Sequence, residues 1–165
     1  MIFSIKKYLR SKKNKHYQDE LIEKLNKEHT KLFEIVTQMD EHIQNENLKQ
    51  IKKLISKFKK ELELHLLYED TNLYEHLYLR YQYYPEIKNE INAKHEEMKN
   101  IAKAVHNFIE THYDFADFHQ FKTDFENVKN VLVKRVSFEE DVLYDIYNNM
   151  YKVDVILYKF KHHKR

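Results

Sequence analysis

His65-Leu-Leu-Tyr-Glu69-Asp70-Thr-Asn-Leu73-Tyr74 is the stretch that decides the fold, because the chain repeats it as Arg135-Val-Ser-Phe-Glu139-Glu140-Asp-Val-Leu143-Tyr144. In each copy an acidic residue comes four positions after a basic one, and an aliphatic residue and a tyrosine follow the acid. Side chains four residues apart share one face of an α-helix, so the basic residue and the acid can contact the same ligand. The copies differ at their first position, where arginine replaces histidine.

Two more histidines extend the repeat upstream. His29 and His95 each lie in the middle of an apolar stripe with helical spacing, 36 residues before His65 and 40 residues before Arg135. The chain therefore contains one pair of helices twice. The apolar alternation after residue 150 fits either an extended segment or a continuation of the last helix. The stripes predict helices over about residues 19–45, 51–80, 85–109 and 118–150.

The composition restricts the fold to helices and the chemistry to a few side chains. The 165 residues include no glycine, one proline (Pro85) and no cysteine. Without glycine there is no phosphate-binding glycine loop, no dinucleotide fingerprint and no nucleophile elbow, and β-hairpins are disfavoured. Without cysteine there is no disulfide, thiolate metal site or thiol nucleophile. Any bound metal must therefore use histidine and carboxylate ligands.

Four helices of roughly 25 to 32 residues with short connections predict an all-α fold, an up-down-up-down antiparallel four-helix bundle. The histidines and acids of the repeat fall in the middle of their helices, and antiparallel neighbours of equal length align their midpoints. These groups should then meet at one level of the core. Their burial without partners would cost several kcal/mol, so something must neutralise them.

This pattern resembles the hemerythrin-like (HHE) family, in which two helices carry a lone histidine and two carry a His-x-x-x-Glu motif. The matching segments are Glu28-His29, His65-x-x-x-Glu69-Asp70, Lys94-His95 and Glu139-Glu140, within about residues 20–150. The resemblance implies a hemerythrin-like four-helix bundle with a non-haem di-iron site that binds or senses oxygen, nitric oxide or iron. Carried over residue by residue, it implies five metal ligands: His29, His65, Glu69, His95 and Glu139.

Arg135 stands where the family has its fourth histidine. Arginine stays protonated and offers no lone pair, so it cannot bind a metal. A buried guanidinium beside Glu69 and Glu139 would instead supply the positive charge of a second ion, as a substitute cation. The number of iron ions is thus open between none and two, and Arg135 favours one or none.

A second, weaker resemblance covers mainly the last predicted helix. The Arg-x-x-x-Glu segment of residues 135–139 is similar to the regulator-of-sigma-D family, four-helix proteins that bind a transcription factor. That resemblance implies a metal-free regulatory protein with a macromolecular partner. The core would then hold an ion pair between Arg135 and the acids.

Charge divides the chain into a basic N-terminal tail (1–18), the bundle (19–150) and a basic C-terminal extension (151–165). Residues 1–15 hold six Lys and Arg and residues 159–165 hold four, so the rest carries 19 basic against 27 acidic side chains, a net charge of −8. The basic ends can contact an anionic membrane or nucleic acid. No apolar run is long enough to cross a bilayer and no secretory signal is evident, so a cytoplasmic location is expected.

Overall fold

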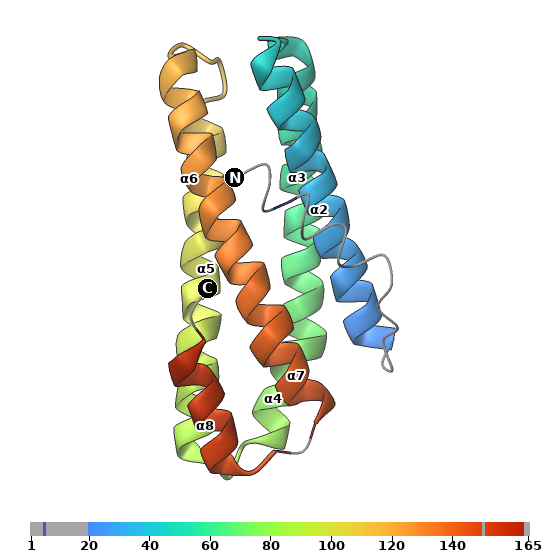
Figure 1. The fold of residues 1–165 in the computed structure, drawn as a ribbon, viewed down its shortest axis with the longest axis vertical. Helices are drawn as coiled ribbons and strands as arrows, with labels where there is room; N and C mark the ends of the chain where they lie inside the picture. The colour runs from blue at the N-terminus through green and yellow to red at the C-terminus, as the bar shows by residue number, and fades with distance from the viewer. Residues whose placement is uncertain (1–4, 6–19, 150, 164–165) are drawn as a thin grey trace.

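Four long helices form the body of the computed structural model, which describes residues 5, 20–149 and 151–163. Figure 1 shows them running alternately up and down as two helical hairpins packed side by side. The predicted all-α, up-down-up-down bundle is confirmed. In chain order the elements are α2 (Glu20–Gln44), α3 (Leu48–Glu69), η1 (Asp70–Tyr74), α4 (Glu75–Arg80), α5 (Pro85–Thr111), α6 (Phe118–Phe138), η2 (Glu139–Leu143), α7 (Tyr144–Asn148) and α8 (Val153–His162). The segments α3, η1 and α4 form one continuous rod, as do α6, η2 and α7.

Capping residues explain where the helices begin. The side-chain oxygen of Asn47, just before α3, accepts a hydrogen bond from the backbone N–H of Gln50 at 3.3 Å. Asp117 caps α6 in the same way by accepting from the N–H of Gln120 at 2.8 Å. Each oxygen satisfies a donor that has no partner within the helix. Pro85 starts α5, where its missing N–H is not needed.

The end of α2 uses a backbone motif that normally contains glycine. The N–H of Glu46 donates to the carbonyl of Ile43 (3.2 Å), and the N–H of Asn47 donates to the carbonyl of His42 (2.9 Å). These two bonds define a Schellman motif, which needs one residue in the left-handed region. Glu46 takes that position with φ 50°. Since the chain has no glycine, a residue with a Cβ atom adopts this costly conformation.

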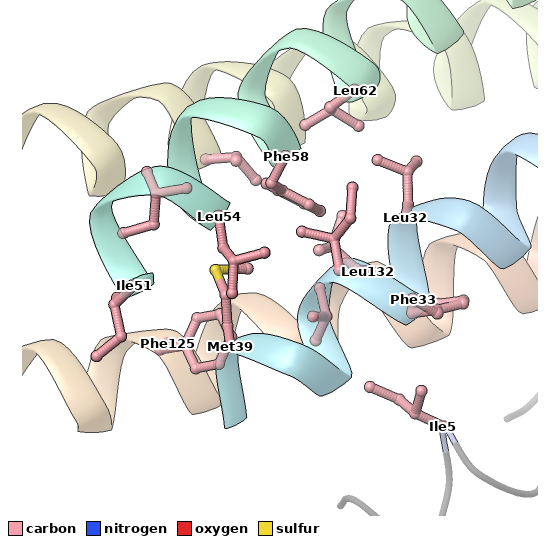
Figure 2. Close-up of a cluster of buried hydrophobic side chains, with 14 of the residues drawn as sticks. Ile5, Leu32, Phe33, Met39, Ile51, Leu54, Phe58, Leu62, Phe125 and Leu132 are labelled. Atoms are coloured by element: carbon pink, nitrogen blue, oxygen red, sulfur yellow. The ribbon is translucent and has the colours of Figure 1, made fainter. Parts of the chain in front are cut away.

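Two clusters of buried apolar side chains fill the bundle. The first, drawn in part in Figure 2, brings α2, α3 and α6 together and includes Phe33, Met39, Phe58, Phe125 and Leu132. The second lies toward the other end and includes Leu25, Leu73, Ile87, Leu143 and Ile156. The histidines and acids of the repeat lie at the level between them.

The described ends of the chain add to both clusters. Ile5 is buried in the first cluster, and the other residues of the predicted basic tail, 1–18, lie outside the described residues. At the other end, extended backbone at Asn149 separates α7 from α8, so residues 153–162 form a distinct helix and not a strand or a continuation. α8 packs against α5 and buries Ile156 and Phe160. No helix among the described residues is long and apolar enough to cross a membrane.

Candidate metal centre

The six residues predicted from the sequence to form the site come from all four long helices of the bundle. They are His29 from α2, His65 and Glu69 from α3, His95 from α5, Arg135 from α6 and Glu139 from η2. All except His95 are at most 4 % exposed. Buried ionisable groups are stable only when they satisfy one another or bind a ligand. Their mutual contacts therefore determine what the site can do.

Each motif contains one turn of π-helix, which begins at Asp70 in the first copy and at Glu139 in the second, a feature that the sequence did not reveal. In η2 the wide turn closes with a hydrogen bond from the N–H of Tyr144 to the carbonyl of Glu139, five residues earlier. The N–H of Glu75 closes η1 on Asp70 in the same way. A π turn holds one residue more than an α turn. Consequently both Leu143 and Tyr144 are buried, and so is the matching Leu-Tyr pair of the first motif.

Three of the buried side chains converge on one point. The Nε2 atom of His29 lies 3.1 Å from Nε2 of His65 and 3.1 Å from Oε2 of Glu139. Ligand atoms from the three residues all lie within 4.8 Å of one another. Metal–nitrogen and metal–oxygen bonds of about 2.0 to 2.2 Å place neighbouring ligand atoms about 3.0 to 3.4 Å apart. The observed distances therefore fit ligands of a single ion.

Two further carboxylates orient these imidazoles. Glu140 contacts Nδ1 of His29 at 3.0 Å, and Glu28 contacts Nδ1 of His65 at 2.9 Å. A carboxylate on Nδ1 holds the ring proton there, so that Nε2 can present its lone pair to a metal. Both Nε2 atoms consequently face the same point.

Glu69 is the one member of the site whose side chain lacks a hydrogen-bond partner among the described residues. Both of its carboxyl oxygens are buried and make no hydrogen bond. Burial, followed by the nearby charge of Glu139, raises the pKa of Glu69 to about 8. A buried polar group without a partner costs about 1 to 3 kcal/mol. A cation at this position would remove that cost.

Charge pairing sets the protonation of the cluster. Burial disfavours the charged ring of His29, but hydrogen bonds to Glu139 and Glu140 outweigh it and raise the pKa to about 9. Burial also disfavours the Glu139 carboxylate, yet the charges of Arg135 and His29 lower its pKa to about 2. For His65 burial prevails and lowers the pKa. The cluster thus combines a charged imidazole, a neutral imidazole and an anionic carboxylate.

Arg135 is fixed beside this cluster by three contacts. Its Nε donates to Glu139, and one terminal nitrogen donates to the hydroxyl of Tyr74. The other terminal nitrogen donates to the backbone carbonyl of Lys94 at 3.2 Å. The guanidinium thus places a permanent positive charge next to a carboxylate of the site. The role of Arg135 as a substitute cation stays a prediction from the sequence.

His95 does not join the cluster. Its Nε2 contacts Oδ1 of Asp70 at 2.8 Å, and its Nδ1 contacts the hydroxyl of Tyr78 at 2.7 Å. The ring also stacks on Tyr74, with centroids 4.1 Å apart. His95 is therefore not among the residues whose ligand atoms converge, which are His29, His65 and Glu139. Its ligand role stays a prediction from the sequence.

The structure adds four residues that the sequence analysis did not assign to the site. Glu28 and Glu140 orient the imidazoles, and each is adjacent in sequence to a predicted ligand. Tyr74 binds Arg135, and the hydroxyl of Tyr144 lies 3.4 Å from Nε2 of His29. The Leu-Tyr pair that both motifs share was the sequence feature that could have pointed to these tyrosines. Regular α-helical spacing does not predict that both members of the pair are buried, because each pair lies at a π turn.

Comparison with known proteins identifies the family. The family model for the hemerythrin HHE cation-binding domain matches residues 20–147, most of the chain. No curated protein and no solved structure matches the chain significantly. The matched range contains every residue of the His29, His65 and Glu139 cluster, and proteins of this kind bind metal ions. The chain therefore belongs to the hemerythrin HHE cation-binding domain family.

Proposed function

We propose that the chain binds one non-haem iron ion through His29, His65, Glu69 and Glu139. Imidazole nitrogens and carboxylate oxygens form a donor set that suits iron. The observation that carries the proposal is the buried Glu69 carboxyl, which makes no hydrogen bond and is near enough to Glu139 and His29 for their charges to act on it. Glu69 is not one of the three residues whose ligand atoms converge, which are His29, His65 and Glu139. A bound cation gives this carboxyl the partner that the described residues do not supply.

A single ion follows from Arg135, which departs from the repeat, and from His95, which matches it in sequence but is held by other side chains. Arg135 cannot bind a metal, and its guanidinium already neutralises Glu139. His95 is held by Asp70 and Tyr78. The second half of the site thus has neither an available imidazole nor a need for a second cation, and we propose a mononuclear centre.

The proposed role is the sensing of oxygen, nitric oxide or iron, iron storage, or protection against oxidants. Iron held here would supply a redox-active ion that can bind a diatomic ligand. The residues of the chain hold and shield that ion: burial of His29 and Glu139 excludes bulk water, and Glu28 and Glu140 keep the imidazoles in place. A cytoplasmic location stays a prediction from the sequence.

Metal analysis of protein produced with added iron tests the proposal. We expect about one iron per wild-type chain and less than about a fifth of that in His65→Ala, because one imidazole ligand is lost. His106→Ala is the matched control, since this half-exposed histidine of α5 lies outside the cluster and its loss should leave iron content unchanged. Fewer than about 0.2 iron ions per wild-type chain after gentle purification would refute the proposal.

A metal-free regulatory protein is the second candidate function. It is favoured by the ion pairs that Glu139 makes with Arg135 and His29, because these neutralise most of the buried charge without a metal. In that case iron-free protein should capture a stoichiometric macromolecular partner, and His65→Ala should not weaken the capture. Loss of partner binding in His65→Ala would contradict this alternative.

A further inference from the structure

We propose that the phenolic oxygen of Tyr144 is a further ligand of the iron. The inference rests on the proposed function, since it concerns the same ion. Tyr144 opens α7 directly after the wide turn that begins at Glu139. Tyrosinate oxygen is an established type of iron ligand in proteins.

The position of the hydroxyl carries the inference. Three atoms surround Nε2 of His29: Nε2 of His65 at 3.1 Å, Oε2 of Glu139 at 3.1 Å and the phenolic oxygen of Tyr144 at 3.4 Å. The last distance falls within the separation of about 3.0 to 3.4 Å expected between neighbouring ligands of one ion. The phenolic oxygen thus lies as close to this imidazole as a ligand of the same ion should.

The ring of Tyr144 is also held in place. It is 2 % exposed and lies nearly parallel to the ring of His29, with an interplanar angle of 10° and centroids 5.8 Å apart. Its backbone N–H donates to the carbonyl of Glu139, a proposed ligand. The same turn of backbone therefore positions a carboxylate and a phenol at the cluster.

The matching tyrosine of the first motif provides an internal comparison. Tyr74 is equally buried, but its hydroxyl accepts a hydrogen bond from Arg135 and its ring stacks on His95. Tyr74 therefore serves the half of the site where arginine replaces histidine. Tyr144 serves the half where both imidazoles converge.

Binding releases three protons to solvent, one each from the phenol of Tyr144, the charged ring of His29 and the protonated carboxyl of Glu69. The resulting phenolate donates an electron pair to the ion. A phenolate is an anionic ligand and gains more from a triply than from a doubly charged ion. Tyr144 should accordingly bind the ferric form in preference to the ferrous form.

The visible spectrum of full-length protein loaded with ferric nitrilotriacetate tests this inference. Phenolate bound to ferric iron absorbs visible light by charge transfer, whereas histidine and carboxylate ligands alone do not produce this band. We expect the band in wild-type protein, its loss in Tyr144→Phe and its retention in Tyr81→Phe, a control at a buried tyrosine outside the site. Resonance Raman excitation within the band should show phenolate ring vibrations in the wild type.

Iron content separates this inference from the function on which it rests. Each spectrum is normalised to bound iron, and thermal unfolding checks that each variant is folded. Wild-type protein that holds iron without the band, or Tyr144→Phe that keeps the band at equal iron content, would overturn the tyrosine ligand alone. Wild-type protein that takes up no iron would overturn the proposed function and this inference together.

Discussion

Arg135 shows at the scale of one residue why the second half of the site cannot be restored by a single change. Arg135→His returns an imidazole to the motif, but His95 still gives both nitrogens to Asp70 and Tyr78. We therefore expect iron content to stay near one ion per chain in Arg135→His. The free energy of unfolding of the metal-free variant should be lower than that of the metal-free wild type by about 3 to 5 kcal/mol, because Glu139 loses its buried partner.

The double variant Arg135→His/Tyr78→Phe tests the role of the tyrosine. Removing the Tyr78 hydroxyl frees the ring of His95 to turn, so that Asp70 can hold Nδ1 as Glu140 holds that of His29. We expect metal analysis to show iron content rising towards about two ions per chain. A second iron bound by Arg135→His alone would show that the Tyr78 contact does not exclude His95.

The Glu69 carboxyl should lower the stability of the metal-free protein and increase its affinity for the metal. Glu69→Met keeps the length of the side chain but removes a buried carboxyl that makes no hydrogen bond. We expect the free energy of unfolding of metal-free protein to rise by about 1 to 3 kcal/mol in urea titrations, and iron content to fall. The control Glu63→Met, at an exposed position of α3, should change stability by no more than about 0.5 kcal/mol. A destabilised Glu69→Met protein would mean that the carboxyl has a stabilising partner.

At the scale of elements, a substitution at the end of α2 should stabilise the fold. Glu46→Gly places glycine at the left-handed position of the Schellman motif, where Glu46 has φ 50°. We expect the free energy of unfolding to rise by about 0.5 to 1 kcal/mol, measured by thermal or urea unfolding. Phe115 is the contrasting case with φ 55°, because its ring packs on Phe118 and Phe121. Phe115→Gly should destabilise the chain, and the same gain at both sites would contradict the packing argument.

The contribution of the α5–α6 connection to the free energy of unfolding should depend on pH, because Asp124 titrates there. A hydrogen bond from His112 (2.9 Å), with a second from Gln120, lowers the pKa of Asp124 below its usual 3.8. A lowered pKa stabilises the folded state above pH 3.8, and this contribution is lost as the pH falls through the lowered value. The stability difference between wild type and Asp124→Asn should therefore shrink in acid. Urea unfolding at several pH values measures it, and a difference that does not change with pH would contradict the prediction.

At the scale of the molecule, the sequence predicted the bundle well because helical apolar stripes and mid-helix histidines are local patterns. The sequence predicted that His29, His65 and Glu139 lie at the same level of the bundle core, and the structure places them close together. It could not predict the π turns, since one extra residue per turn changes the facing of later side chains without interrupting the stripe. The orientation of His95 was equally beyond it, because contacts from another rod, at Asp70 and Tyr78, fix that ring.

Helix α8 should contribute to the stability of the whole bundle. Phe160 is 7 % exposed and packs near Phe138, with ring centroids 6.0 Å apart. Phe160→Ala should lower the free energy of unfolding by about 3 to 5 kcal/mol, as expected for a large core side chain. Tyr158→Ala, at a position of the same helix that is 63 % exposed, should change it by no more than about 0.5 kcal/mol. Equal effects in chemical denaturation would mean that α8 does not pack on the core.

The two π turns fall in corresponding parts of the two helical hairpins, one residue apart relative to the motif. η1 begins at Asp70, the residue after its glutamate, and η2 begins at Glu139 itself. A π turn is equivalent to an α turn with one inserted residue. Deleting one residue from either turn should therefore rotate all the side chains that follow it by about 100° around the helix axis and move the buried Leu-Tyr pair out of the core.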